Sequence, residues 1–357
     1  MALAVILRPV LGLSAASRWK APALIFVLCA GVYTATLGSR VPGPSDNAHF
    51  VHLANSFLHG QLSVVGDKAP GDNDWSRYRG KWFVSFPPFP ALVILPAVAA
   101  FGLEVWDRLF WALFAGLGPA LLYVLLRRLR ESGDSSRSVR EDLSLTALFA
   151  FGSAYYYTAV QGTVWFAAHV VAVPLIALYL LCALGAKRPV LAGGLLGLCF
   201  MTRPTTLLLG IVFVVEALDA ARTPTPPTAA AFDEPEAQPS ALERTWSWLR
   251  AVDVAPALRS LALFALPLAA IGGIAMWLNA ARFDDPFEFG HNYLNIRWRG
   301  RIDKWGLFNY HYLSKNLAVF LAALPWLSAH APYLEISRHG LALWLTTPPY
   351  LGVLQPR

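Results

Sequence analysis

Long apolar stretches separated by short polar segments dominate the chain. Five of them approach the roughly 20 residues that a helix needs to cross the hydrocarbon core of a bilayer. They are residues 21–38, 106–126, 143–160, 165–184 and 261–280. Few charges interrupt these stretches, so the pattern predicts an all-α, polytopic bundle of about eight to ten transmembrane helices.

Shorter apolar segments lie between and after these stretches. Residues 89–103 are few for a span and contain Pro90 and Pro96, which favours a re-entrant or interfacial helix. Residues 189–219 read as two short helices hinged at Thr202-Arg203-Pro204, because a proline inside a helix breaks it. The last apolar piece is 341–354.

Composition agrees with a membrane protein. Of 357 residues, 56% are hydrophobic and 14% are charged, whereas soluble domains carry about 25% charged residues. The net charge of +7 comes from short basic loops between apolar spans, where Lys and Arg set orientation and meet lipid headgroups. Membrane lipid is therefore the expected partner, and nucleic acid is not expected.

The distribution of basic residues predicts an orientation. Arg8, Arg18 and Lys20 place residues 1–20 in the cytoplasm, and the basic loop at 127–140 belongs on the same side. The first apolar run resembles the core of a signal peptide, but it is long and many spans follow, so a first transmembrane helix is predicted. An even number of crossings then makes 39–105 a large outer loop within a bundle over 21–219.

The second half is predicted in the same way. Residues 220–258 are polar and proline-rich, which indicates a disordered cytoplasmic linker. Further transmembrane helices follow in 259–357, with a second outer loop at 281–315. The predicted location is the inner or plasma membrane, crossed many times.

The first outer loop holds an amphipathic pattern. A helix is predicted between Ser45, a good N-cap, and Gly60, a good residue after a helix end. Asp46 would lie in its first turn, where the helix dipole favours an ionised carboxylate, and a simple capping role is the plainer alternative. One side is apolar, the other carries the loop's three histidines, and the helix is expected to lie along the membrane surface.

Histidines and a hairpin supply the other candidate chemistry in this loop. His49 and His52 are spaced as two metal ligands but lack a third, so no metal or cofactor is predicted, although a divalent metal stays an alternative. Tyr78–Gly80–Trp82 predicts a short hairpin with aromatic and basic residues at its tip. Such residues suit a binding site or an ordinary interface anchor.

Several motifs follow one another in a fixed order. Asp46 comes directly after the first span and begins a segment that ends in Leu58-x-Gly60-x-Leu62. The next two motifs are Tyr78-x-Gly80-Lys81 and the pair Pro87-Pro88, which precedes an apolar segment ending in Phe101-Gly102. The run 192–204 and the loop 283–290 complete the order. In this order they resemble the GT-C superfamily of polytopic glycosyltransferases. The likeness is to the branch with protein O-mannosyltransferases and aminoarabinose transferases, over about residues 20–350.

The resemblance implies an enzyme that moves a hexose from a polyprenyl-phosphate donor to an extracytoplasmic acceptor, with Asp46 as general base. The chain has Asn47 where the family often has a second acid, and Phe86 where related members have lysine before the proline pair. Lys81 is the candidate in place of that lysine. Relatives usually have further spans after 341–354, so a C-terminally truncated member is expected.

A departing lipid phosphate needs fixed cations. Arg203 is the first candidate because an arginine within apolar sequence needs water or an anion, and Arg297 and Arg299 are weaker ones. His291 and Tyr293 are candidates for lining an acceptor groove.

Two other functions fit a multispanning chain. One is a transporter or lipid flippase, and the other is an inactive, truncated relative with a structural role. Transporters place ionisable groups near the bilayer midplane, whereas here acids and bases gather in the predicted outer loops, which favours chemistry at the membrane surface.

Overall fold

The computed structural model describes residues 17–66, 68–71, 73–223, 240–307, 309–337 and 339–354, and most of them are helical. Within these ranges, four helical segments are long and apolar enough to cross a membrane. They are Arg18–Arg40, Asp107–Glu131, Val164–Ala186 and Val254–Phe283. The predicted helical class is confirmed at this level, and four apolar helices indicate a membrane protein.

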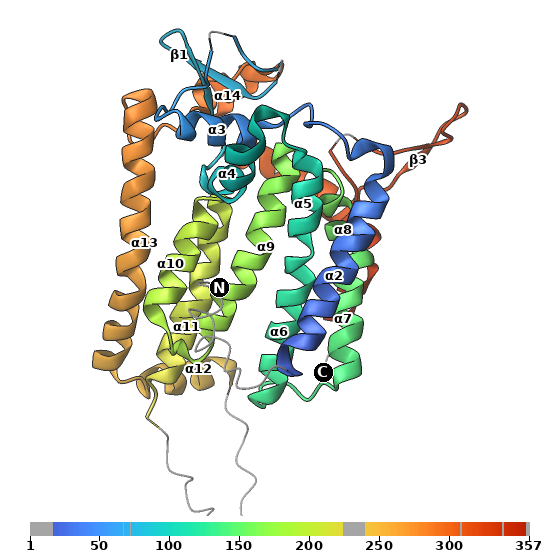
Figure 1. The fold of residues 1–357 in the computed structure, drawn as a ribbon. Helices are drawn as coiled ribbons and strands as arrows, with labels where there is room; N and C mark the ends of the chain where they lie inside the picture. The colour runs from blue at the N-terminus through green and yellow to red at the C-terminus, as the bar shows by residue number, and fades with distance from the viewer. Residues whose placement is uncertain are drawn as a thin grey trace, which may run out of the picture.

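These segments form the long parallel rods of Figure 1. The helices are α2 (Ser17–Leu37), α5 (Asp107–Ala115) continued by α6 (Leu117–Glu131), α9 (Val164–Ala183) and α13 (Val254–Phe283). Short 3₁₀ turns extend α2 and α9, namely η1 (Gly38–Arg40) and η3 (Leu184–Ala186).

The fifth predicted span, 143–160, is not one helix. It divides into α7 (Val139–Phe151) and α8 (Ala154–Ala159) at Gly152. Ser153 has an extended backbone and its hydroxyl accepts a hydrogen bond from the Tyr155 N–H, so a new helix begins there. A local serine cap therefore interrupts an otherwise apolar run.

The hinge predicted in 189–219 is confirmed. Helix α10 (Pro189–Phe200) is followed by the 3₁₀ turn η4 (Pro204–Leu209) and then α11 (Gly210–Ala220). Arg203 has an extended backbone immediately before Pro204, as expected for a residue preceding proline.

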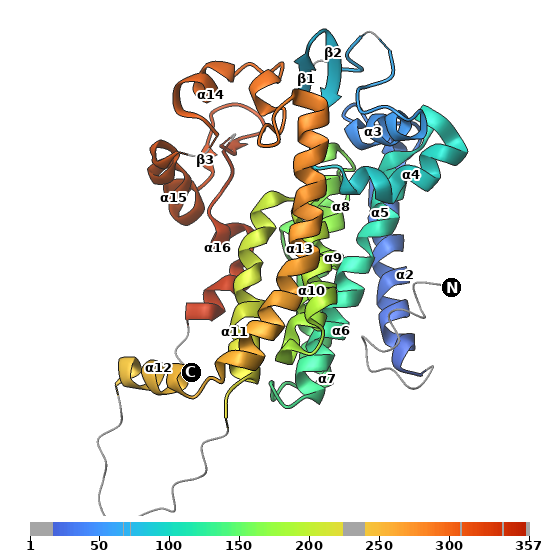
Figure 2. The same cartoon turned by 90° about the vertical axis from the view of Figure 1, so that its left-hand side faces the viewer.

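A layer of short elements covers one end of the bundle (Figure 1). It contains α3 (His49–Leu58), the strands β1 (Trp75–Tyr78) and β2 (Lys81–Val84), and α14 (Arg299–Trp305). The 13-residue helix α4 (Phe89–Phe101) lies across the same end in Figure 2, followed by η2 (Gly102–Glu104). The predicted hairpin is confirmed: β1 and β2 pair antiparallel, and Arg79 and Gly80 both have positive φ, as a two-residue turn requires.

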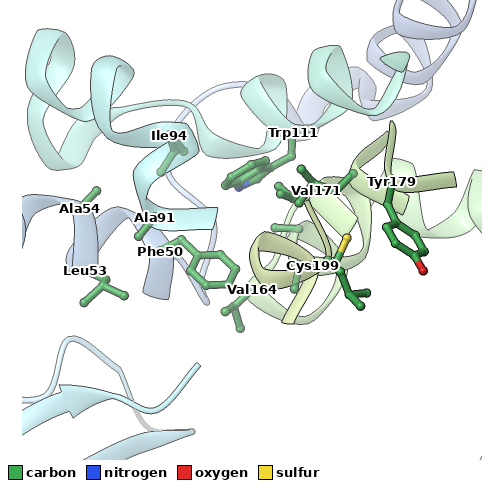
Figure 3. Close-up of a cluster of buried hydrophobic side chains, with 14 of the residues drawn as sticks. Phe50, Leu53, Ala54, Ala91, Ile94, Trp111, Val164, Val171, Tyr179 and Cys199 are labelled. Carbon is green, nitrogen blue, oxygen red and sulfur yellow. The ribbon is translucent and has the colours of Figure 1, made fainter. Parts of the chain in front are cut away.

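The main core lies beneath this layer (Figure 3). Phe50 and Leu53 of α3 pack with Ile94 of α4, Trp111 of α5 and Val164 of α9, all nearly inaccessible to solvent. The apolar stripe predicted for α3 is therefore present, but it packs on protein. The expectation that α3 lies along the membrane surface stays a prediction.

The second half differs more from the prediction. The linker 220–258 contains α12 (Ala241–Arg250), so it is not disordered there, and 224–239 lie outside the described residues. Beyond α13 come η5 (His291–Tyr293), η6 (Tyr310–Tyr312), α15 (Leu313–Ala322), β3 (Trp326–Leu327), β4 (Leu334–Glu335), α16 (Leu343–Thr346) and η7 (Pro348–Leu354). In the described part of 259–357, only α13 reaches the length of a span.

Candidate functional site

Asp46 lies in a turn before α3. That helix begins at His49 with Ala48 as its N-cap, so the predictions of Ser45 as the cap and Asp46 in the first turn are wrong. Ser45 instead donates from its backbone N–H and its hydroxyl to the two carboxylate oxygens of buried Asp107, at 2.7 and 2.6 Å. This contact joins the turn to the start of α5.

The carboxylate of Asp46 faces solvent next to an arginine. Its side chain is 92% exposed, and its Oδ2 lies 3.7 Å from Nη2 of Arg108, whose side chain is 18% exposed. Arg108 follows Asp107 in α5, so the contact that fixes Ser45 also brings the opposite charges together. Arg108 was not among the residues predicted for the site.

Trp75 of the hairpin covers the first two histidines of α3, His49 and His52, while His59 is exposed. His49 is fully buried, stacks on Trp75 with ring centroids 4.0 Å apart, and places Nε2 3.1 Å from the carbonyl of Asn73. Burial lowers the pKa of His49 to about 4 and also lowers the pKa of His52. His49 is thus neutral at pH 7, and the described residues contain no group of three or more His, Cys, Asp or Glu placed to hold a metal.

The hairpin also fixes the second predicted outer loop. The Ser76 hydroxyl donates to the carbonyl of Gly290 at 2.6 Å, and Trp75 and Asn295 exchange two hydrogen bonds. Ser76 further forms an isolated antiparallel bridge with Leu294. The two loops predicted from separate parts of the chain are therefore one layer.

Aromatic and charged groups hold the tip of the hairpin to this loop. Tyr78 donates to Asp284 at 2.8 Å, and Arg79 forms an ion pair with the same carboxylate at 2.8 Å. Tyr293 packs on Tyr78, with ring centroids 4.7 Å apart. Asp284 thus has a structural role, and Tyr293 lies against the hairpin.

Arg203 lies against the first turn of α9. Its guanidinium donates to the carbonyl of Trp165, while its Nε is buried without a hydrogen-bond partner in the described part of the chain. The backbone N–H of Val164, one residue earlier, donates to the carbonyl of Asn47 at 3.2 Å. The segment 164–165 therefore contacts both the hinge of Arg203 and the turn of Asp46.

A second carboxylate lies close to this segment. Asp74 accepts a hydrogen bond from the indole N–H of Trp165 at 2.8 Å, and burial raises its pKa. Sequence reasoning missed Asp74, which stands in a loop without regular pattern; its position at the start of the hairpin was the only signal.

His291 is half-buried near Asp74. Burial lowers its pKa, while the charges of Glu288 and Asp74 act in the opposite direction. Its Nδ1 is buried and no residue of the described ranges hydrogen-bonds to it. The structure thus brings His291 toward Asp74.

Of the other predicted cations, Lys81 and Arg297 are exposed and Arg299 is half-buried. Lys81 stands on β2 opposite Tyr78, and Arg297 is in the loop before α14. Arg299 pairs with Asp303 one helical turn away at 3.1 Å. Within the described ranges, none of these three residues forms a hydrogen bond or ion pair with Asp46 or Arg203.

A buried arginine that the sequence did not single out lies in the last turn of α13. Arg282 donates to the carbonyl of Val84 at 3.0 Å and to the side chain of Asn279 at 2.8 Å. These bonds tie the end of β2 to α13. Its donors are used internally, which suits a structural role.

Comparisons of the chain with protein-family models, with curated proteins and with solved structures find no match.

Proposed function

We propose that the chain is a multi-pass glycosyltransferase of the inner or plasma membrane. It moves a hexose from a polyprenyl-phosphate donor to an acceptor hydroxyl on the extracytoplasmic side, with Asp46 as general base. The observation that carries the proposal is that the turn of Asp46 and the hinge of Arg203 both bond to the start of α9. Asn47, next to the exposed Asp46, accepts from the Val164 N–H, and Arg203, whose Nε has no hydrogen-bond partner in the described residues, donates to the Trp165 carbonyl.

The distribution of basic residues supports the sidedness. The last turn of α6 carries Arg128 and Arg130, and Lys187 and Arg188 lie between α9 and α10. These helix ends lie opposite the layer of α3, as can be followed in Figure 1. Because basic residues favour the cytoplasmic side, the layer with Asp46 belongs outside. The four long apolar helices, with the pairs α7–α8 and α10–α11, support several crossings.

The reaction requires one proton transfer and one substitution. As the acceptor oxygen forms a bond to the anomeric carbon, its proton passes to the carboxylate of Asp46. The bond between the anomeric carbon and the phosphate oxygen breaks, and its electron pair leaves with the lipid phosphate. An exposed carboxylate at a surface turn can reach an acceptor without a conformational change.

The leaving phosphate is assigned to Arg203. Its buried Nε can donate to an anionic oxygen, and a charged hydrogen bond gains strength where water is excluded. Lys81, Arg297 and Arg299 are cations of the same layer and are the weaker candidates. His291 and Tyr293 are proposed to line the acceptor side.

The test is Asp46→Asn in membranes supplied with a labelled polyprenyl-phosphate sugar. The variant removes the base and keeps the size of the side chain, so transfer should fall by about 10²–10⁴-fold. Asp285→Asn is the matched control, because Asp285 is an exposed acid of the same layer that accepts only a local bond from Phe287. Unchanged transfer in the Asp46 variant would remove Asp46 as the base.

A second candidate is a non-catalytic multispanning protein, such as a lipid flippase or an inactive, truncated relative. One observation favours it: an entirely apolar cavity of about 520 Å³ between helices. Its lining runs from Phe89 of α4 to Trp19 of α2, with residues of α6, α9 and α10 between them. Binding of the lipid by wild-type protein with no sugar transfer would favour this candidate.

A further inference from the structure

Helix α12 is a defined structural element within the polar linker. Ser240 accepts a hydrogen bond from the N–H of Glu243, and the Glu243 carboxylate accepts from the N–H and hydroxyl of Ser240. This capping box satisfies donors that a free helix end would leave exposed. The ten-residue helix Ala241–Arg250 therefore has a defined N-terminus.

One side of α12 is fixed to the end of α11. The indole N–H of Trp248 donates to Asp219 at 3.1 Å, and the guanidinium of Arg222 lies 5.6 Å from the centre of the Trp248 ring. Backbone bonds from Thr223 to Ala251, and from Asp253 to Ala221, hold the chain after the helix. These contacts determine which side of α12 faces away from the protein.

The side that faces away is apolar. Leu242, Trp246 and Leu249 are spaced at i, i+4 and i+7, and they are 72%, 56% and 41% exposed. This spacing aligns them on one face of the helix. Arg250 is exposed beside this row, and its guanidinium lies 5.8 Å from the Trp246 ring centre, whereas Arg244 is exposed on the opposite side of the helix.

The connection between α12 and α13 places α12 at the depth of one end of α13. Only three residues separate α12 from α13, whose exposed Val254 and Leu258 begin the apolar surface. A helix of 30 residues is about 45 Å long, which exceeds the roughly 30 Å hydrocarbon core, so its ends reach the headgroup region. Figure 2 shows α12 running across the base of the bundle beside the start of α13.

We propose that α12 binds the surface of the bilayer that the apolar helices cross. Leu242, Trp246 and Leu249 insert among the acyl chains, while Arg250 contacts anionic phospholipid headgroups. An exposed apolar row with a tryptophan and an adjacent arginine has the composition of an interfacial helix. The inference depends on insertion of the chain in a bilayer and not on glycosyl transfer.

The test uses the full chain in lipid nanodiscs with single spin labels. Leu242→Cys, Trp246→Cys and Leu249→Cys report the apolar face, and Arg244→Cys and Ser247→Cys are controls on the other side of the helix. The native Cys29, Cys182 and Cys199 are buried. Labels at 242, 246 and 249 should collide with oxygen and be protected from a water-soluble nickel chelate, with the reverse at 244 and 247.

Two results would overturn the insertion. Equal nickel accessibility at all five positions would mean that α12 lies in water. Labels at 242, 246 and 249 that are immobile and reached by neither reagent would mean that the face is covered by protein, such as a second copy of the chain.

The headgroup contact has its own measurement. The label at 242 should lie deeper in discs of phosphatidylcholine mixed with phosphatidylglycerol than in discs of phosphatidylcholine alone. The variant Arg250→Gln should abolish the difference. Equal depth in both lipids with Arg250 present would overturn the contact with anionic headgroups.

Discussion

The guanidinium of Arg108 lies 3.7 Å from the carboxylate of Asp46, at the point where the turn before α3 meets the start of α5. The arginine is mostly enclosed and the carboxylate is almost fully exposed. An exposed ion pair contributes only about 0–1 kcal/mol to stability. Its effect is therefore to favour one orientation of Asp46, which makes Arg108 a positioning residue.

The first prediction concerns this pair. Arg108→Gln should lower transfer by up to about 10-fold, because a screened pair supplies roughly 1 kcal/mol. In an Asp46→Asn background the same change should have little further effect, since the group that it positions has already lost its function. The measurement is a double-mutant cycle on kcat/KM with the labelled donor. Additive losses would show that Arg108 acts independently of Asp46.

The second prediction concerns Arg203. Arg203→Lys keeps a positive charge but loses the planar fork of donors that reaches both Trp165 and an anion. The KM for the polyprenyl-phosphate donor should rise by about 10- to 100-fold, the value of a buried hydrogen bond to a charged group. Arg301→Lys is the matched control, because Arg301 is an exposed arginine of the same layer. A lower kcat with unchanged KM would contradict a contact with the bound donor.

Local rules predicted several elements correctly. Arg79-Gly80 can adopt left-handed backbone conformations, so the hairpin was readable from its turn. Pro204 has no N–H to continue a helix, so the hinge was readable as well. Four spans followed from length and hydropathy alone. Each of these features depends on residues close together in the sequence.

Features decided by distant partners were not predictable. Ser45 has the chemistry of an N-cap, but Asp107 lies 62 positions away and binds it instead. His49 lies on the polar side of its helix, yet Trp75 covers it. Arg108 was missed for the same reason. It stands at the start of an apolar span, and the sequence does not show that the turn of Asp46 packs against it. A helical pattern predicts which residues share a face of a helix, but it does not predict which part of the chain covers that face.

The third prediction is a pH dependence of stability. The folded pKa of His49 is about 4, whereas an unfolded histidine titrates near about 6.5. The unfolded state therefore binds more protons between these values, so stability is lost as pH falls from about 6.5 towards 4, by roughly 3 kcal/mol in total. The pKa values of His52 and His291 are lowered too and act with the same sign.

His49→Gln separates the contribution of His49 from the others. Glutamine cannot become charged in this range and can still donate to the carbonyl of Asn73. The melting temperature of the wild-type chain in detergent should fall more steeply between pH 7 and pH 5 than that of the variant. Parallel curves would show that His49 is not protonated on unfolding in this range.

The fourth prediction tests the packing of α10 against α13. A Cβ at Gly193 would collide with the backbone carbonyl of Phe264, and one at Gly197 would lie 2.6 Å from the Ile271 side chain. Small residues four positions apart allow this close approach of two helices. Gly193→Ala should therefore separate the helices and destabilise the chain by about 1–3 kcal/mol.

Gly194→Ala is the matched control. Its Cβ would lie 4.0 Å from Pro267, so this variant should have unchanged or slightly higher stability. Thermal unfolding in detergent measures both variants, and an equal effect of the two would mean that α10 and α13 are not in contact at Gly193.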